Sequence, residues 1–543
     1  MIAMRTDVLS MILGWTLIAL SLPLAASGIA TAFLDSIELA LISFAIPCLI
    51  SLVLGITMLT LWTRTNTSER LRDKEAFAAV ALMWPLAVFI GCLPFWFGGV
   101  FVGPFTEGAA FIDIARGGVN SWFESMSGFT TTGATVISHN MSPNCIPGTT
   151  LDCINAQPKG ILIWRSLTQW LGGMGIIMLG MMILSRIIGG GMALARAELT
   201  GPYLTRLKPK LRQTALALWS LYIMLTIIEM LLLKFLGGMT FFDSFNHALT
   251  TVASGGFSTR DASIGYYDSM TIESIIIIFM FIAGVNFTLI WLFCMKEFKR
   301  ASKDEEFNNY LVYLAVAICA MILALLATEV SLGNSLRYSI FNVISIGTST
   351  GYSSTDYGAW PIVTQIIFLT LMIIGASAGS TSGGLKLLRI NLAFKVAMRE
   401  LVKIAQPRRI DRIRMNGEVI EKQQLGLIVG MLFVWIGLFA ISCILLAICM
   451  PNDSFESIIS VVASSLGNTG PALGEYGPSS NWASMNTPTL LITSILMWFG
   501  RLELLTAVIL LHPRTWKKEE KDLTERSALT MWRRMIPTKD NKE

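Results

Sequence analysis

The chain has 543 residues, of which 53% are hydrophobic and only 14% are charged, and its mean hydropathy is +0.62. Soluble domains carry about 25% charged residues, so this composition excludes an ordinary soluble protein and predicts a multi-pass protein of the lipid bilayer. The net charge of +5 is explained by basic residues on one side of that membrane, and no nucleic-acid partner is indicated. Three histidines and no paired carboxylates argue against an enzyme.

Ten apolar segments are long enough to cross about 30 Å of hydrocarbon. In chain order they cover residues 8–33, 39–62, 76–98, 160–186, 212–236, 271–295, 310–331, 361–384, 424–450 and 488–511. If these segments simply alternate, five clusters of Lys and Arg all fall on one side of the membrane. The clusters lie at 64–74, 186–212, 296–303, 386–422 and 514–542. Basic residues favour the cytoplasmic side, so we expect both termini in the cytoplasm.

One short pattern occurs four times on the opposite, outer side, each time between two apolar segments. The copies read FESMSGFTTTGATV from Phe123, FNHALTTVASGGFST from Phe245, FNVISIGTSTGYSS from Phe341 and FESIISVVASSLGNTGPAL from Phe455. We expect half-length helices at 120–129, 242–251, 336–346 and 454–464, each followed by extended chain. Irregular backbone at membrane depth is tolerated only where it is buried in protein or lines water. Four such loops therefore predict parts of one pore.

The predicted fold is an all-α membrane protein with an N-terminal helix pair and four helix–pore-loop–helix units. The units are expected in a pseudo-fourfold arrangement around a central ion pore. The helix pair covers residues 1–75, and the units cover 76–200, 201–303, 304–422 and 423–543. Unit 3 contains a broken second helix and a basic cytoplasmic segment, and unit 4 ends in a cytoplasmic tail.

The small residues at the end of each loop are the candidate ion-binding residues. A permeating cation exchanges its water shell for fixed oxygens such as backbone carbonyls, and Gly lets neighbouring carbonyls turn inward because it reaches positive φ without steric cost. The stretch contains no carboxylate, which favours a monovalent cation. The alternative is that each loop is merely a turn. The candidates are Thr131, Thr132, Gly133, Ser254, Gly255, Gly256, Ser349, Thr350, Gly351, Asn468, Thr469 and Gly470.

Two further features suggest a gate. The run GASAGSTSGG within the span 361–384 disfavours a continuous helix, because each Gly costs up to about 1 kcal/mol relative to Ala. It predicts an intramembrane loop containing Gly375, Gly379, Gly383 and Gly384, the alternative being a closely packed helix of small residues. Arg501 lies near the middle of the last span, where a charge costs about 2.5 kcal/mol or more and usually faces the bundle interior. A buried structural pair is the alternative for Arg501, and Arg165 is expected to snorkel outward from a helix end.

These loops, together with WRSLTQWLGGMGI from Trp164, GASAGSTSGGLK from Gly375 and MWFGRLEL from Met497, resemble the Trk/Ktr/HKT superfamily of potassium transporters. Within it, the chain is most similar to the membrane subunit of bacterial Trk potassium uptake. The resemblance implies a homodimer in the bacterial inner membrane, with Arg501 and the intramembrane loop blocking the potassium path below the filter. Gly at all four filter positions implies potassium selectivity. The fourth loop departs most, because Gly470 follows Phe455 by fifteen residues, against ten or eleven in the other loops.

The resemblance also implies a cytosolic partner, a ring of nucleotide-binding subunits of the TrkA type. The basic segment 386–422 is either a docking surface for that partner or a contact with anionic lipid. The chain itself has no nucleotide-binding glycine motif and no predicted cofactor, and potassium is its expected substrate. Channel-like passage and symport with protons or sodium both stay open, and an organic-substrate carrier is the weaker alternative. Cys145 and Cys153 share an outer loop and could pair.

Overall fold

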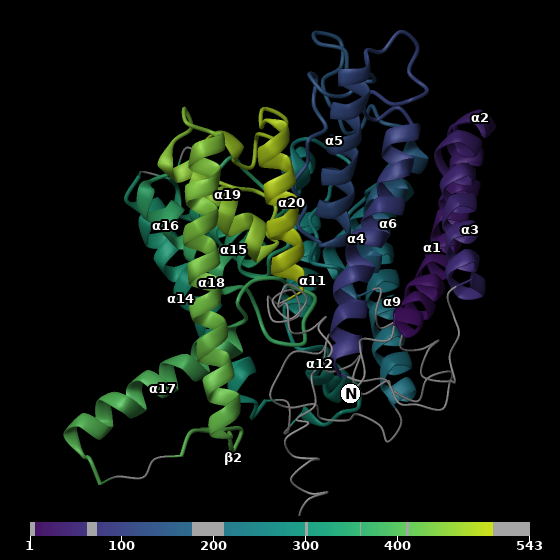
Figure 1. Ribbon diagram of the computed structural model, residues 1–543. Helices are drawn as coiled ribbons and strands as arrows, with labels where there is room; N and C mark the ends of the chain where they lie inside the picture. The colour runs from purple at the N-terminus through teal and green to yellow at the C-terminus, as the bar shows by residue number, and fades with distance from the viewer. Residues whose placement is uncertain are drawn as a thin grey trace, which may run out of the picture.

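The computed structural model describes residues 6–61, 73–175, 211–298, 302–328, 330–358, 360–408 and 412–502. Nearly all of the secondary structure in them is helical, and most of the long helices run roughly parallel (Figure 1). The described strands form one short antiparallel hairpin, β1 (Arg414–Met415) and β2 (Glu418–Val419), at the lower end of the molecule in Figure 1. The predicted all-α membrane fold is confirmed in its main features.

The N-terminal pair consists of α1 (Thr6–Leu34) and a second rod made of α2 (Ile37–Ala40), a π-helical turn (Leu41–Ala45) and α3 (Ile46–Leu61). Small side chains bring the two rods close together. The hydroxyl of Ser10 donates to the carbonyl of Met58 at 2.8 Å, and that of Ser51 donates to Leu17 at 2.8 Å. Interhelical hydrogen bonds of this kind are typical of helix packing in membranes.

Each of the four following units contributes a long helix, a shorter helix that enters from the upper face, and a returning helix. Unit 1 contains α4 (Asp73–Phe97), α5 (Phe111–Phe129) and α6 (Lys159–Gly173). Unit 2 contains α9 (Leu211–Phe235), α10 (Phe241–Val252), a 3₁₀ turn (Ser263–Tyr267), α11 (Met270–Ala283) and α12 (Phe287–Cys294). Unit 3 contains α14 (Glu305–Leu326), α15 (Leu332–Gly347), α16 (Ile362–Ile374) and α17 (Leu387–Ala405). Unit 4 contains α18 (Lys422–Cys449), α19 (Phe455–Gly467), a 3₁₀ turn (Gly474–Tyr476) and α20 (Thr487–Arg501).

The four half-length helices α5, α10, α15 and α19 exist as predicted, although their starts differ by one to nine residues. Three of them begin at a polar cap, because a side-chain oxygen satisfies a free backbone N–H of the first turn. The caps are Thr240, Ser331 and Ser454. Helix α5 begins at Phe111, nine residues before its predicted start at 120, and Phe111 itself is 86% exposed. The expected range therefore covered only the inserted part of this helix.

Ten spans were expected, one of them broken within 361–384, and the described residues contain six helices long and apolar enough to cross a membrane, or seven with one bent pair. Of the other expected spans, 160–186 and 488–511 begin as α6 and α20, and their second halves lie outside the described residues. Helix α16 ends at Ile374, so the predicted break within 361–384 is present. The expectation of a continuous helix over 271–295 is wrong, because α11 and α12 meet at an angle of 107°.

The bend between α11 and α12 pairs with the break after α16. Backbone groups that a helix would satisfy internally instead bond to the segment 375–386, and Asn286 caps α12 by accepting from the N–H of Thr288 at 2.8 Å. The bonds join Ser377 N–H to Gly284 O, Thr381 N–H to Ala283 O and Gly379 O to Phe287 N–H, at 3.2, 3.4 and 3.0 Å. Every buried backbone group needs a partner inside a membrane, so each break makes the other possible.

Candidate ion pathway

The four half-length helices end in the same backbone motif. The residue after the last turn lies in the left-handed region, at φ values of +55°, +53°, +54° and +51° for Thr131, Ser254, Ser349 and Asn468. Positive φ is uncommon for residues other than Gly, so four equivalent cases are a shared feature. The next N–H bonds to the carbonyl five residues earlier, as in a Schellman helix end. These bonds are Thr132 to Ser127, Gly255 to Thr250, Thr350 to Ser345 and Thr469 to Ser464, at 2.8, 2.9, 2.8 and 3.0 Å.

A glycine with positive φ follows each of these ends. The φ values are +89°, +77°, +83° and +98° for Gly133, Gly256, Gly351 and Gly470. Each glycine lies against the carbonyl of the residue that precedes the next loop's glycine, and a Cβ there would overlap with that oxygen. The contacts run from Gly133 to Gly255, from Gly256 to Thr350, from Gly351 to Thr469 and from Gly470 to Thr132. The fourth contact returns to the first loop, so residues 131–133, 254–256, 349–351 and 468–470 form a closed ring, called the ring below.

The ring also shows how the fourth loop aligns with the others. Gly470 occupies the same place as the other three glycines despite its longer distance from Phe455. Phe455 is the first residue of α19 and is 79% exposed, whereas Phe123 and Phe341 are fully buried within α5 and α15. Phe455 is therefore not the counterpart of the other phenylalanines, and the expected alignment at Phe455 is wrong. The buried residue ten positions before Gly470 is Ser460.

Loops 1 and 3 are braced within themselves. The hydroxyls of Thr130 and Thr132 lie 2.8 Å apart, and those of Thr348 and Thr350 lie 2.8 Å apart. In both loops a serine hydroxyl from the preceding helix also donates to the carbonyl that follows the glycine. These bonds run from Ser127 to Ala134 and from Ser345 to Tyr352, each at 2.6 Å. Loops 1 and 3 therefore hold their shape with their own side chains.

Loops 2 and 4 are braced instead by residues from outside the loop. Gln169 of α6 donates its amide N–H to the carbonyl of Gly255 at 2.6 Å and accepts from the N–H of Phe257 at 3.0 Å. Asn468 donates to the hydroxyl of Thr132 at 3.0 Å and to the carbonyl of Met497 in α20 at 2.9 Å. The ring thus has two self-supported and two externally supported loops.

A buried ion pair lies behind the ring. Arg165 of α6 and Glu124 of α5 are 2% and 0% exposed, and their Nε and Oε1 atoms are 2.7 Å apart. The carboxylate of Glu124 accepts from the N–H of Val136, after the first ring glycine, at 3.1 Å. The guanidinium of Arg165 donates to the carbonyl of Ser258 at 2.9 Å and lies 3.5 Å from the ring centre of Phe257. A cation over an aromatic face is attracted to its π electrons. The pair therefore joins the backbone beyond the first two ring glycines.

The expectation that Arg165 snorkels outward is wrong, and the roles of Glu124 and Gln169 were missed. Arg165 and Gln169 are four residues apart on α6, so they lie on one face of that helix. Polar residues at this spacing within WRSLTQW were the available signal, because a membrane helix places such a face toward protein. Their buried partners come from α5 and loop 2, distant in the sequence.

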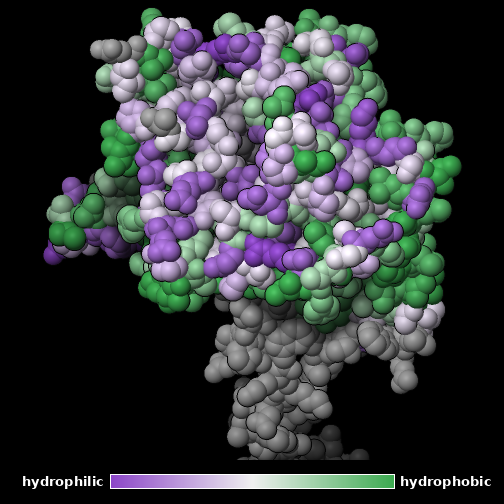
Figure 2. All heavy atoms as spheres, turned by 90° about the horizontal axis from the view of Figure 1, so that it is seen from above, coloured by the Kyte–Doolittle hydropathy of each residue, from purple (hydrophilic) through white to green (hydrophobic). Residues whose placement is uncertain are grey.

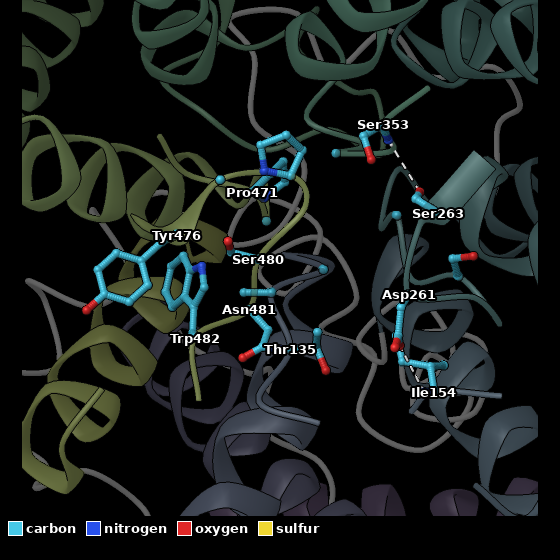
Figure 3. Close-up of a pocket in the computed structure, with 18 of the residues that line it drawn as sticks. Thr135, Ile154, Asp261, Ser263, Ser353, Pro471, Tyr476, Ser480, Asn481 and Trp482 are labelled. Carbon is cyan, nitrogen blue, oxygen red and sulfur yellow. Dashed lines mark hydrogen bonds between the residues drawn. The ribbon is translucent and has the colours of Figure 1, made fainter. Parts of the chain in front are cut away.

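The upper mouth of the ring is lined by residues from all four units (Figure 3). The four ring glycines form its base, and Thr135, Asp261, Ser353 and Asn481 are among the side chains around it. Seen from above, the hydrophilic residues gather over the middle of this face, with hydrophobic residues around the rim (Figure 2). The lining of the mouth carries both signs of charge, including Arg260 and Asp261.

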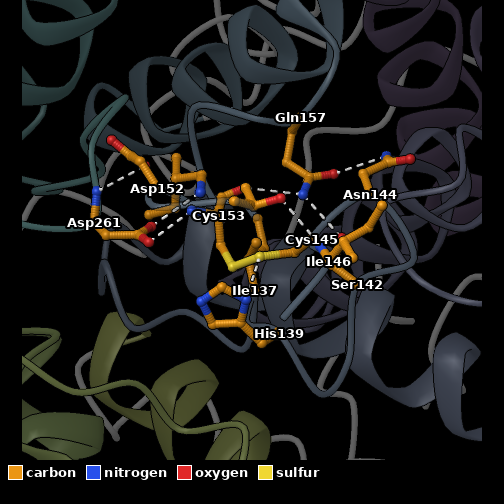
Figure 4. The surroundings of a disulfide bond; sticks show 12 residues. Ile137, His139, Ser142, Asn144, Cys145, Ile146, Asp152, Cys153, Gln157 and Asp261 are labelled. Carbon is orange, nitrogen blue, oxygen red and sulfur yellow. Dashed lines mark hydrogen bonds between the residues drawn. A yellow bond between two sulfur atoms is a disulfide. The ribbon is translucent and has the colours of Figure 1, made fainter. Parts of the chain in front are cut away.

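The disulfide loop closes over one side of this mouth. Cys145 and Cys153 are bonded, as the sequence allowed, and the N–H groups of Cys153 and Ile154 donate to the carboxylate of Asp261 at 2.7 and 2.9 Å (Figure 4). Asp152 lies 3.8 Å from Arg260, and burial raises the pKa of the Asp152 carboxyl above its ordinary value. The disulfide thus fixes a loop that touches the segment after the second ring glycine.

The segment 375–386, called the floor segment below, contacts the opposite end of the ring. The hydroxyl of Thr381 lies 2.8 Å from that of Ser254, and the N–H of Gly383 donates to the hydroxyl of Ser349 at 2.6 Å. Ser254 and Ser349 are the left-handed residues of loops 2 and 3, so the floor segment touches the ring directly. The predicted intramembrane loop is therefore present, and the alternative of a closely packed helix is wrong.

The four glycines proposed for the gate lie along the floor segment. Gly375, Gly379 and Gly384 have φ values of +70°, +74° and +81°. Gly383 lies against the carbonyl of Gly467, and a Cβ there would come 2.8 Å from the Cβ of Asn468. Position 383 therefore requires glycine because two backbones approach closely there, whereas the other three positions require glycine because their φ is positive.

Arg501, the last residue of α20, joins three units beneath the ring. Its guanidinium donates to the carbonyl of Thr381 in the floor segment at 2.9 Å. It also donates to the carbonyls of Gly172 and Gly173 at the end of α6, at 2.7 and 3.1 Å. The arginine therefore fixes the floor segment against units 1 and 4, in the place where the sequence suggested a gate.

Known proteins that are similar to this chain are cation transport proteins. A family described as TrkH, cation transport protein, matches residues 50–518. The Trk system potassium uptake protein TrkH of Salmonella typhimurium is 36% identical over 469 residues, which are 86% of this chain and 90% of that protein. The Escherichia coli protein of the same name is 35% identical over the same shares. The crystal structure of the potassium transporter TrkH from Vibrio parahaemolyticus is similar with a TM-score of 0.78 at 29% identity, covering 95% of this chain and 100% of that one.

Proposed function

The chain belongs to the TrkH family of cation transport proteins, and from this membership we propose that it is the potassium-translocating membrane subunit of a Trk uptake system. The observation that carries the proposal is the closed ring, in which four equivalent glycines each lie against a carbonyl of the next loop. The relatives named above are potassium uptake proteins, which supports potassium as the substrate.

The ring has the chemistry of a filter for a monovalent cation. Carbonyl rings replace the hydration shell of an ion that must bind weakly enough to leave again. The C-terminal ends of α5, α10, α15 and α19 all reach the ring, and the negative end of each helix dipole favours a cation there. The twelve ring residues include no carboxylate, which would favour a divalent cation. Potassium would enter from the upper mouth and shed its water at the glycines.

The floor segment and Arg501 would then control passage beyond the ring. The floor segment is bonded to Ser254 and Ser349, and Arg501 is bonded to Thr381. A fixed positive charge at this point repels a cation that leaves the ring. Opening therefore requires the floor segment and Arg501 to separate. Neither the ring nor residues 375–385 contain a carboxylate that could carry a coupled proton, which favours channel-like passage over symport.

The assembly and orientation follow from the same proposal. The upper mouth would face the outside of a bacterial inner membrane, with both termini in the cytoplasm, because the basic clusters then lie inside. Only 22% and 17% of the apolar windows of α14 and α18 are buried within the chain, which leaves room for lipid and for the second subunit of a homodimer. The chain has no nucleotide-binding glycine motif, so control by nucleotide would come from cytosolic subunits of the TrkA type.

The proposal is tested in a bacterium that lacks its own potassium uptake systems. The wild-type chain, supplied with its cytosolic partner, should restore growth on low potassium. Gly133→Ser should lose this rescue or admit sodium, because a side chain at φ +89° meets the carbonyl of Gly255. Gly430→Ala is the matched control, since a Cβ on this glycine of α18 meets no atom within 4 Å. Failure of the wild type to rescue would contradict the potassium assignment.

A further inference from the structure

The start of α14 carries three consecutive acidic residues, each with a different partner. Glu306 is 6% exposed, and its Oε1 accepts from the backbone N–H of Ala378 in the floor segment at 2.6 Å. Asp304 accepts from the amide of Asn416 at 2.7 Å, and the N–H of Glu305 donates to the same amide's oxygen at 2.8 Å. Asn416 occupies the turn of the short hairpin, so a single helical turn contacts both the hairpin and the floor segment.

Two more contacts support this junction. The carboxylate of Glu305 lies 2.5 Å from the ammonium of Lys395 in α17, and Lys395 also donates to the carbonyl of Arg414 at 3.0 Å. A small apolar cluster, separate from the main core, joins the hairpin to the floor segment through buried side chains. The cluster contains Ala378, Leu388, Leu392, Ile413, Met415, Ile420, Leu425 and Ile428. Ala378 is therefore held by a polar contact to α14 and by an apolar cluster that it shares with the hairpin.

Glu306 binds the floor segment at Ala378, whereas Arg501 binds it at Thr381. A buried carboxylate is costly unless it is hydrogen-bonded, and here the bond goes to a backbone N–H that the broken helix leaves free. The bond to a charged acceptor is stronger than one between neutral groups. The geometry thus places a strong hydrogen bond at the lower side of the floor segment, opposite the contacts of that segment with the ring.

We propose that Asp304–Glu306 is the positioning element of the gate, which transmits movement of the hairpin at residues 413–420 to the floor segment. Glu306 holds Ala378 while the hairpin holds Asp304 and Glu305, so displacing the hairpin shifts both the start of α14 and the apolar cluster beneath Ala378. The hairpin lies at the lower end of α18 and away from the upper mouth (Figure 1), where a cytosolic partner could move it. This inference rests on the proposed function, because it assumes that the floor segment closes the ion path.

The test uses the full chain reconstituted in proteoliposomes, with rubidium uptake as the readout and sodium uptake as the measure of selectivity. Glu306→Ala should raise rubidium flux without partner by at least about tenfold, the factor expected for loss of a charge-assisted hydrogen bond. The ratio of rubidium to sodium uptake should not change, because the ring is untouched. Glu306→Gln should raise the flux less than Glu306→Ala, since its amide oxygen can still accept from Ala378 but carries no charge.

The proposed role of the hairpin is tested by Asn416→Ala, alone and combined with Glu306→Ala. Asn416→Ala should raise the flux less than Glu306→Ala and should add nothing in the double variant, because both act through one element. Glu418→Ala, which removes an exposed carboxylate from the same hairpin, is the control and should leave the flux unchanged. If Glu306→Ala fails to fold, Asn416→Ala at the exposed turn still tests the link.

Several outcomes would overturn the inference. Flux in folded Glu306→Ala at or below the wild-type level would show that Glu306 does not hold the floor segment closed. Equal flux in the Gln and Ala variants would exclude the hydrogen bond as the cause, and multiplicative effects in the double variant would exclude transmission from the hairpin. Failure of the proposed function looks different, because wild type with its partner and Arg501→Ala would then also carry no rubidium.

Discussion

The ring and the floor segment are built in different ways, although they touch each other. The ring uses one backbone motif four times, with the same left-handed residue, the same helix-end hydrogen bond and the same glycine contact. The floor segment occurs once, and side chains of other units hold it, notably Ser254 and Arg501. A carbonyl cage must enclose the ion from all sides, whereas a gate needs a single part that can leave the path. The repeated ring thus provides selectivity, and the floor segment, which is not repeated, provides control.

The largest effect is expected from disturbing the repeated part. Gly256→Ala places a Cβ at φ +77° against the carbonyl of Thr350, and strain of this kind is expected to reduce potassium uptake at least about a hundredfold. Uptake by whole cells at equal membrane expression measures the effect. Gly333→Ala, on a glycine of α15 whose Cβ would meet no atom within 4 Å, should remain active. Near-normal uptake by Gly256→Ala would show that the ring contact is not needed.

Substituting the buried ion pair behind the ring should have nearly as large an effect, but on the stability of the protein rather than on uptake. Arg165→Met leaves the carboxylate of Glu124 buried without its partner, which should lower the free energy of unfolding by about 3–5 kcal/mol. Replacing both residues by apolar ones should restore part of this loss, because no unpaired charge remains. Thermal unfolding in detergent compares the single and double variants. Equal loss in both would contradict the role assigned to the pair.

Substituting Arg501, which binds the floor segment, should raise ion flux instead of lowering it. Arg501→Ala breaks the bonds to Thr381, Gly172 and Gly173, and we expect rubidium flux to rise about tenfold with unchanged selectivity. The flux of Arg501→Lys should lie between those of the wild type and Arg501→Ala, because one ammonium cannot reproduce a guanidinium that reaches two units. Proteoliposome flux measures both variants, and an unchanged flux at equal incorporation would argue against a gating role.

A smaller rise is expected where the floor segment touches the ring. Thr381→Val removes the hydroxyl contact with Ser254 but keeps the backbone carbonyl that binds Arg501. Loss of one such hydrogen bond corresponds to about 1 kcal/mol, so the flux should rise about fivefold. Thr381→Ser keeps the hydroxyl and should match the wild type. A Val variant with the flux of the Ser variant would show that this contact does not hold the floor.

The smallest effect is expected at the disulfide, which lies above the ring. Reducing the bond between Cys145 and Cys153 frees a short loop but leaves the contacts of the ring and floor intact. We expect a loss of stability of about 2 kcal/mol and rubidium flux within about twofold of the oxidised protein. Flux before and after mild reductant provides the measurement. Abolished flux would place the disulfide loop within the pathway.

Much of this architecture could be predicted from the sequence because it is repetitive or chemically unusual. Four loops of Thr, Ser and Gly predicted four half-length helices, and a run of small residues predicted the break after Ile374. The division into a helix pair and four units at 1–75, 76–200, 201–303, 304–422 and 423–543 stays a prediction. The role of the ring residues likewise awaits the transport experiments.

What was missed depends on partners that are distant in the chain. The bend at Gly284 has a weak local signal, since it is stabilised by backbone bonds to Ser377 and Thr381. Arg165 looked like a helix-end residue because its partner, Glu124, lies on another helix. Phe455 matched the repeated pattern by its sequence alone, although its exposure shows that it has another place. Local composition predicts breaks and loops, but not which of them pair.

The central claim is that the closed ring binds the transported cation, and anomalous diffraction from crystals soaked in rubidium tests it most directly. We predict anomalous density within the ring bounded by Gly133, Gly256, Gly351 and Gly470, with the signal lost when potassium competes. Density confined to the acidic residues of the upper mouth, or none in a ring whose structure is intact, would contradict the claim.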